Sequence, residues 1–272
     1  MRSSFKFLLL AIALSAALSG CASTTQSGAV GADRSQLLLV SAEQLNQTAA
    51  KQYATLTGKA AQQGALNRDP AQAQRVKAVA ARLIPQTAVF RPDAVQWKWE
   101  VNVLSSKEVN AWCMPGGKIA VYTGLIDRIN PTDDELAAVM GHEIAHALRE
   151  HSRERASQEL AKSAVIGIGA ALLGLGSAGA DLGNVLATVT FSLPFSREHE
   201  READRIGVEL AARAGYDPRA AITLWQKMAQ VGGGGSVELL STHPAPASRI
   251  EDLDVYSAKV MPLYETAKAQ RR

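Results

Sequence analysis

The sequence predicts an α+β fold that is mainly α-helical, and three observations support this class. Apolar residues recur with helical spacing, next to helix-capping residues, along most of the 272-residue chain. Alternation of apolar and polar residues is confined to a short stretch that begins at Trp97, and a strong turn signal, Pro115-Gly116-Gly117, follows it. We therefore expect a small, mainly antiparallel sheet packed on a helix that contains VMGHEIAHALREHS, residues 139–152.

The first twenty residues differ from the rest of the chain. Arg2 and Lys6 precede an apolar run too short for a stable membrane-spanning helix, which is the pattern of a secretory signal peptide, residues 1–20. Small residues precede Cys21, as in the lipobox of bacterial lipoproteins, where the cysteine is lipidated and becomes the mature N-terminus. Because Ala22 rather than aspartate follows, this resemblance implies a lipid anchor in the bacterial outer membrane, facing the periplasm. The alternative is an ordinary signal peptide with an incidental cysteine.

Charge and cysteine content narrow the function classes. Removing Arg2 and Lys6 with the signal peptide lowers the formal net charge from +3 to +1, so electrostatics give no case for nucleic acid as a partner. If Cys21 carries lipid, Cys113 has no partner for an internal disulfide. We expect Cys113 to be buried and inert, although a free thiol in an oxidising compartment could also pair between chains.

The mature chain is expected to form one domain, residues 36–272, behind a small and polar lipidated tether, residues 21–35. The run from Ser163 to Ala180 has no charged residue, and its glycines weaken a free-standing helix. We favour a buried or lid-like pair of short helices there over a membrane span, with a membrane-touching hairpin as a third reading. Capping signals and apolar stripes predict helices near residues 41–64, 69–84, 131–152, 196–215 and 217–230, and another at the end of the chain.

His142 and His146 lie four residues apart in a helix whose start is marked by a capping box, Thr132 with Glu135. At this spacing both imidazoles project from one face toward a common point, and neutral imidazole nitrogens suit Zn²⁺. Glu143 lies one residue on, where its carboxylate can reach a water at the metal without being a ligand. Two histidine ligands with such a base form the arrangement of a metalloprotease.

His151 is the nearest candidate for a third ligand, but helical geometry argues against it. It lies nine residues after His142, about 900° of helical rotation, and therefore on the opposite side of a continuous helix. The metzincin pattern also fails, because Arg149 and Ser152 occupy the positions of its glycine and its third histidine. We expect His151 to be solvated or to lie at the C-terminal end of the helix.

A third ligand must therefore come from elsewhere, and the segment FSREHEREADRIG, residues 195–207, offers several carboxylates. Here the chain resembles the HtpX, Oma and CAAX prenyl protease family of gluzincin metallopeptidases, especially its small periplasmic lipoprotein members, in two motifs: His142-Glu143-x-x-His146 and Glu200-x-x-Ala203-Asp204. The resemblance implies a gluzincin-type core and one Zn²⁺ per chain with Glu200 as third ligand. It also implies that Asp204 forms a hydrogen bond to a ligand histidine.

Helical spacing is consistent with these two roles. Glu200 and Asp204 lie four residues apart on one face, so one can bind the metal while the other orients an imidazole. Glu198 and Glu202 point elsewhere, and we expect both to be solvated. His199 faces away from Glu200 and is expected to be structural.

Residues 110–124, NAWCMPGGKIAVYTG, resemble the strand and turn that precede the metal helix in the same family. The resemblance implies an edge strand along which an extended peptide is added to the sheet. The residues implied to bind substrate are Gly117, Lys118, Ile119, Ala120 and Val121. An ordinary hairpin is the alternative.

Residues 241–250, STHPAPASRI, resemble the late His-Pro segment of the family. This implies that His243 approaches the metal, where it either occupies the open position in a resting state or stabilises the oxyanion. Arg249 would act nearby as a charge partner. A histidine before proline in a loop could equally lie on the surface.

These motifs predict a zinc-dependent endopeptidase of the bacterial cell envelope that cleaves unfolded or misassembled proteins, with zinc-bound water activated by Glu143. The implied partners are extended polypeptides, the membrane through Cys21, and the outer-membrane assembly machinery. The alternative is a zinc-stabilised periplasmic chaperone or assembly factor with latent or regulated protease activity. Glu143 favours the enzyme, because a purely structural zinc site would not need it.

Overall fold

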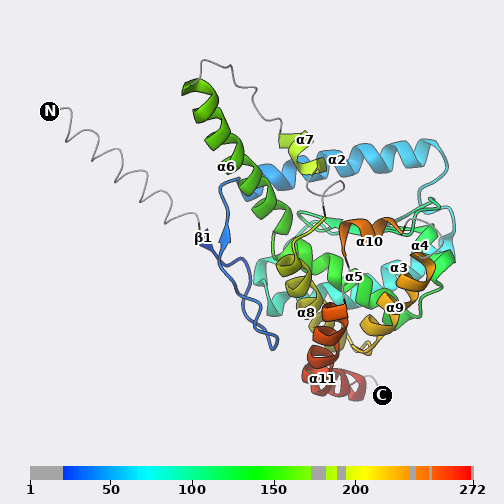
Figure 1. Cartoon of the computed structure of the whole chain (residues 1–272). Helices are drawn as coiled ribbons and strands as arrows, with labels where there is room; N and C mark the ends of the chain where they lie inside the picture. Colours follow the sequence, from blue (N-terminus) through cyan, green and yellow to red (C-terminus); the bar gives the residue numbers. More distant parts are fainter. Residues whose placement is uncertain (1–20, 173–181, 189–193, 233–236, 245–246, 271–272) are drawn as a thin grey trace.

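The computed structural model describes residues 21–172, 182–188, 194–232, 237–244 and 247–270, and Figure 1 shows a mainly helical molecule. The strands are β1 (Cys21–Ala22), β2 (Gln36–Leu37), β3 (Glu100–Leu104), β4 (Ala111–Met114) and β5 (Lys118–Tyr122). The longer helices are α2 (Ala42–Gln62), α3 (Pro70–Leu83), α5 (Asp133–Leu148), α6 (His151–Leu172), α8 (Arg197–Arg213), α9 (Ala220–Gly232) and α11 (Ala247–Ala269). The shorter ones are η1 (Ile84–Val89), η2 (Pro92–Gln96), α4 (Thr123–Ile129), α7 (Leu182–Ala187) and α10 (Glu238–Thr242). The predicted α+β, mainly α class is confirmed.

Helix α5 lies at the centre of the core, and every residue from Glu135 to Leu148 is buried. Its first turn carries the predicted capping box. The Glu135 N–H donates to the Thr132 hydroxyl at 3.2 Å, and the Thr132 N–H donates to the Glu135 carboxylate at 2.8 Å. Helices α3, α8 and α9 and strand β4 pack around α5, so the helix is held from several sides.

Helices α5 and α8 approach closely because glycines face each other at their crossing. A Cβ atom on Gly207 of α8 would lie 2.9 Å from the backbone nitrogen of His142, and one on Gly141 of α5 would lie 2.9 Å from the carbonyl oxygen of Gly207. Neither side chain could be accommodated without moving backbone. The close crossing places the carboxylates of α8 next to the histidines of α5.

The three-stranded sheet has the order β3-β5-β4, and it is mixed rather than mainly antiparallel. The hairpin at Gly116 pairs β4 and β5 antiparallel, as predicted, but β3 adds to the other side of β5 in parallel. The expectation that Gly117, Lys118, Ile119, Ala120 and Val121 form an edge strand is therefore wrong. Both sides of β5 are already paired, so it has no free edge for a peptide. The sheet packs on α5 through β4, as expected.

Residues 21–35 do not run free of the domain, which differs from the predicted tether. Val30 and Ala32 are 2% and 3% exposed. The N–H groups of residues 29 and 30 donate to Glu209 of α8, and the guanidinium of Arg149 donates to oxygen atoms of the segment. A small and polar composition matches a linker, but here buried charged groups of the body bind the backbone. The predicted signal peptide, residues 1–20, lies outside the described residues.

Helix α6 begins at His151 and continues through Leu172, extending away from the body in Figure 1. The expected pair of short helices between Ser163 and Ala180 is thus a single helix as far as Leu172, and residues 173–181 lie outside the described part of the chain. Among the described residues, no helix combines the length and apolar character that crossing a membrane requires.

Candidate metal centre

Helix α5 presents His142 and His146 one turn apart on the same face. Their Nε2 atoms lie 3.1 Å from each other, and both side chains are buried. The other ring nitrogen of each is engaged, Nδ1 of His142 with Asp204 and Nδ1 of His146 with His151. Two Nε2 lone pairs therefore converge on one point, an arrangement that a cation would stabilise.

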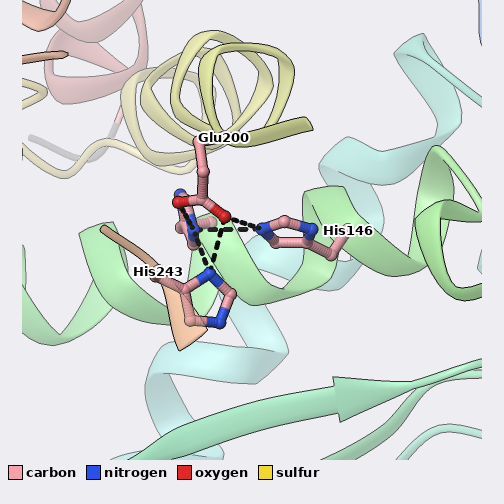
Figure 2. A group of neighbouring side chains, drawn as sticks. His146, Glu200 and His243 are labelled. Carbon is pink, nitrogen blue, oxygen red and sulfur yellow. Dashed lines mark hydrogen bonds and ion pairs between the residues drawn. The ribbon is translucent and has the colours of Figure 1, made fainter. Parts of the chain in front are cut away.

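Glu200 and His243 complete a cluster around that point, and Figure 2 shows the carboxylate of Glu200 reaching from α8 toward His146 and His243. Oxygen atoms of Glu200 lie 3.5 Å from Nε2 of His142 and 3.5 Å from Nε2 of His146. Nδ1 of His243 lies 2.9 Å from Glu200 Oε1 and 3.3 Å from Nε2 of His142. The four donor atoms all lie within 4.8 Å of one another.

These four residues fit a zinc ion in donor type and in spacing. Three imidazole nitrogens and one carboxylate oxygen are ligands that zinc prefers, and tetrahedral bonds of about 2.0–2.1 Å place neighbouring donors about 3.3 Å apart. The separations just given, which involve both carboxylate oxygens of Glu200, run from 2.9 to 3.5 Å, and four donor atoms taken one from each residue lie within 4.8 Å of one another. Three of these candidate ligands, His142, His146 and Glu200, come from two adjacent helices, and His243 stands at the fourth corner.

Asp204 and Arg249 support the cluster from behind. Asp204 Oδ1 lies 3.0 Å from Nδ1 of His142, and Arg249 donates to both Asp204 oxygens at 2.7 Å. Nη1 of Arg249 also forms an ion pair with Glu200 Oε2 at 2.6 Å. Burial opposes ionisation of Asp204, but Arg249 and His142 outweigh it and hold its pKa below the usual range. Arg249 thus pairs with two carboxylates of the cluster region, Asp204 and Glu200.

Glu143 lies on the other side of the cluster, and its position fits a base rather than a ligand. It is 4% exposed, and its Oε1 forms no hydrogen bond with any of the described residues. The nearest cation-forming group is Nε2 of His243, 3.6 Å from that oxygen. Burial raises the pKa of Glu143 above its ordinary value. A buried carboxylate with an unused oxygen and a raised pKa is suited to taking up a proton.

Burial disfavours the charged forms of His146, His243 and Glu200, whereas neighbouring groups of opposite charge favour them. Burial lowers the pKa of His146 well below its usual value, so this imidazole is neutral, as a metal ligand must be. Burial would also lower the pKa of His243, but the carboxylates of Glu200 and Glu143 outweigh burial and raise it. Burial opposes the charge of Glu200 as well, but His243, His146 and His142 outweigh it and hold the pKa of Glu200 well below its usual value.

A cavity of about 390 Å³ opens beside the cluster. Glu143, His146 and His243 line one side of it, and strand β4 lines another. Cys113 also lines this cavity but is only 6% exposed and has no disulfide partner. Burial raises the pKa of its thiol well above the ordinary value, in keeping with the predicted inert cysteine.

The predictions for His151 and Glu202 are wrong. Both are buried, at 0% and 5% exposed, and His151 lies beside His146 instead of on the opposite face of the helix. The reason is that α5 ends at Leu148 and Glu150 adopts a left-handed conformation, φ +49°, before α6 begins. The nine-residue rotation argument assumed an unbroken helix. No glycine or proline marks this break, so the sequence carried no signal for it.

The neighbouring predictions agree with the structure. The side chain of Glu198 is 63% exposed, as expected. His199 is buried, stacks on His151 at a ring-centroid distance of 4.3 Å and lies 3.1 Å from Glu154, so its contacts are structural.

The fold and the cluster together define a metallopeptidase. A histidine pair on one helix and a carboxylate from a second helix lie beside a cavity that the buried carboxylate of Glu143 also lines. The sequence model of Peptidase family M48 matches residues 70–257, and the chain belongs to this family, which is zinc-dependent. The family resemblance and the zinc cofactor expected from the sequence are therefore confirmed.

Named relatives agree with this family. The chain is 41% identical over 151 residues to the mitochondrial metalloendopeptidase OMA1 of Arabidopsis thaliana, covering 56% of this chain and 30% of the relative. It is 35% identical over 202 residues to the mitochondrial metalloendopeptidase OMA1 of Bos taurus, covering 70% and 38%. It is 30% identical over 194 residues to the beta-barrel assembly-enhancing protease of Escherichia coli, covering 68% and 38%. The chain thus spans 30–38% of the length of these three relatives.

Proposed function

We propose that this protein is a zinc-dependent endopeptidase that cleaves extended polypeptide. The single observation that carries the proposal is Glu143, a buried carboxylate with an unused oxygen on the same cavity as His146. A zinc site that only stabilised the fold would have no use for such a group, and burying a carboxylate oxygen without a hydrogen bond costs stability. The metalloendopeptidase names of the OMA1 relatives support the same activity.

The residues around the cluster have different roles in the proposed reaction. His142, His146 and Glu200 would hold zinc, which when bound supplies a Lewis acid for the scissile carbonyl and for water. Glu143 takes a proton from the attacking water and returns it to the leaving amine, and its raised pKa suits both transfers. His243, whose Nε2 faces Glu143, is placed to donate to the developing oxyanion once it leaves the fourth corner.

Strand β4 is the better candidate for the peptide-binding edge. One side of β4 pairs with β5 and the strand lines the cavity beside Glu143. An extended peptide paired with β4 would run past the metal cluster, and unpaired strand edges are templates for such pairing. The residues from Ala111 to Met114 are only 1–6% exposed, and Glu238, Thr242 and His243 line the same cavity as the strand. We therefore expect the segment that carries α10 and His243 to move when a peptide enters.

That closed arrangement supports a second candidate function, a chaperone or assembly factor with latent protease activity. Nδ1 of His243 stands at the fourth corner of the cluster, where a substrate carbonyl would otherwise bind. In this role, zinc stabilises the fold and cleavage begins only when His243 withdraws. Regulated activity and the endopeptidase are compatible in one molecule.

The proposed location is the periplasmic face of a bacterial outer membrane, with a lipid on Cys21 and misassembled envelope proteins as substrates. The support is the signal-like residues 1–20, the lipobox pattern before Cys21 and Ala22 after it. The relative named beta-barrel assembly-enhancing protease favours assembly machinery of the outer membrane as a partner. Incorporation of a labelled fatty acid at Cys21 would test the anchor directly.

The test of the enzymatic proposal is the substitution Glu143→Gln, assayed with unfolded casein. We expect cleavage to fall by at least about 10²-fold, the lower range for loss of a positioned acid–base group, while bound zinc is retained. Glu198→Gln is the matched control, because it neutralises an exposed glutamate outside the cavity and should cleave as wild type does. Equal cleavage by wild type and Glu143→Gln would refute the general base.

A further inference from the structure

His151 lies beside a metal-ligating histidine and is fully buried. Its Nδ1 is 2.9 Å from Nδ1 of His146, so one of these nitrogens carries a hydrogen and the other accepts it. Nε2 of His146 faces the metal cluster and must be free of hydrogen to bind an ion. The single ring hydrogen of neutral His146 is therefore on Nδ1. His146 is the donor in this pair and His151 is the acceptor.

The opposite edge of the His151 ring is consistent with this assignment. Because Nδ1 accepts, the hydrogen of neutral His151 lies on Nε2, and Nε2 points at Glu202 Oε2 at a distance of 3.0 Å. Both hydrogen bonds, from His146 to His151 and from His151 to Glu202, are thus satisfied when His146 carries its hydrogen on Nδ1 and His151 carries its hydrogen on Nε2. None of the ring nitrogens along this path is left unsatisfied.

Glu202 is held in place by two arginines. Nη2 of Arg149 donates to Glu202 Oε1 at 2.8 Å, and Nη2 of Arg34 donates to Oε2 at 3.1 Å. These pairs offset the cost of burying the carboxylate and restrict its rotation. The acceptor for the His151 N–H is therefore fixed in direction. Arg34 belongs to the N-terminal segment, so this segment takes part in the support.

The turn at Glu150 brings His151 to this position. Glu150 has φ +49°, a conformation that is unfavourable for a residue other than glycine. Its carboxylate is held by Arg91 Nη1 at 2.5 Å and Arg153 Nη1 at 2.6 Å, which stabilises the turn. Without this break the helix would carry His151 away from His146.

We propose that His151 is a positioning residue of the metal site, which fixes the ring orientation and the tautomer of His146 and is itself anchored by Glu202. At the other ligand, Asp204 accepts directly from Nδ1 of His142. At His146 a histidine stands between the ligand and the carboxylate. Partners of this kind raise metal affinity by orienting the ligand. The inference rests on one part of the proposed function, that this cluster binds zinc. It does not require that the protein cleaves polypeptides.

The experiment measures zinc affinity by competition with a chromophoric chelator for the wild-type chain and its variants. His151→Leu removes the acceptor, and we expect zinc to bind about 10–100-fold more weakly. His151→Asn places a carbonyl oxygen close to the former position of Nδ1, so it should recover most of the affinity. The visible spectrum of the cobalt(II)-loaded protein should shift in His151→Leu, because the ring of His146 is no longer held.

His199→Leu is the matched control, since His199 is another buried histidine that stacks on His151 but has no hydrogen bond to His146. It should bind zinc as tightly as wild type. Glu202→Gln keeps the shape of the side chain that anchors His151, so it tests the same role even if His151→Leu fails to fold. We expect Glu202→Gln to weaken zinc binding too, but less than His151→Leu does.

Each outcome bears on the inference. Unchanged affinity in both His151→Leu and Glu202→Gln would overturn the positioning role and leave the proposed function intact. An equal loss in His199→Leu would also overturn it, because general packing would then be the cause. A wild-type chain that binds no zinc would remove both the positioning role and the proposed function.

Discussion

At the scale of single residues, the metal motif shows what local spacing can and cannot predict. The positions of His142, Glu143 and His146 follow from one turn of helix, a local property of the sequence. Glu200 could be assigned only through the family resemblance, because several carboxylates lie near it in sequence. His151 was placed wrongly, since its position depends on the backbone of Glu150, which nothing in the residue types around it encodes.

Removal of Arg249 should strongly destabilise the metal-free fold. Arg249 is a buried cation that faces two buried carboxylates, Asp204 and Glu200. Replacing it with methionine leaves both charges buried and poorly compensated, and breaking such a pair costs about 3–5 kcal/mol. We expect Arg249→Met to lower the free energy of unfolding in urea by that amount in the zinc-free protein.

The control for this measurement is Arg205→Met, also on the α8 side of the molecule. Arg205 pairs with Asp252 at 2.9 Å, but both side chains are partly exposed, at 28% and 21%. Exposed pairs contribute about 0–1 kcal/mol, so this variant should be nearly as stable as wild type. Similar losses in the two variants would contradict the special role of Arg249.

At the scale of elements, local pairing was predictable and distant pairing was not. The turn at Pro115-Gly116-Gly117 predicts the hairpin of β4 and β5, because the signal and its consequence lie within a few residues. The parallel addition of β3 to β5 joins segments that no turn connects directly, and no local pattern specifies it. The family resemblance assigned the substrate edge to residues 117–121, and without knowledge of the β3 pairing nothing in the sequence corrected it, although β4 is the strand that lines the cavity.

The crossing of α5 and α8 makes a second prediction at this scale. In Gly207→Ala the new methyl group would meet the backbone of His142 at 2.9 Å, so the two helices must separate. Such overpacking costs about 1–3 kcal/mol. Because His142 and Glu200 lie on the two separating helices, we expect zinc affinity to fall as well, measured by chelator competition alongside urea unfolding.

Gly58→Ala in α2 provides the contrast, because nothing lies within 4 Å of the added methyl group. Glycine in a helix interior is about 0.5–1 kcal/mol less favourable than alanine, so this variant should be more stable and bind zinc normally. Normal zinc affinity in Gly207→Ala would show that the crossing does not position the ligands.

At the scale of the whole molecule, the N-terminal segment carries the proposed lipid anchor and also contacts residues that support the metal cluster. The sequence alone did not indicate that one segment serves both. Residues 21–35 were predicted to be a spacer, yet Arg34 reaches Glu202, which in turn contacts His151 beside the proposed metal ligand His146. Composition predicts flexibility from the segment alone, whereas the buried charges that bind it belong to distant helices. A lipid on Cys21 would therefore hold the catalytic body close to the membrane surface.

The last prediction concerns that anchor. In cells that process bacterial lipoproteins, wild type should be recovered with the outer membrane and should incorporate a labelled fatty acid, because a lipidated Cys21 adds buried methylene groups to the bilayer. Cys21→Ala should lose the label, and the protein should leave the membrane fraction.

Cys113→Ala is the control, since Cys113 is buried in the domain and should leave labelling and fractionation unchanged. Label retained by Cys21→Ala, or wild type recovered without any label, would show that Cys21 is not lipidated. Because Ala29, Val30 and Arg34, and not the thiol of Cys21, bind the segment to Glu209 and Glu202 of the body, the purified Cys21→Ala protein should still bind zinc as tightly as wild type. Loss of the anchor and loss of the metal site can thus be separated in one variant.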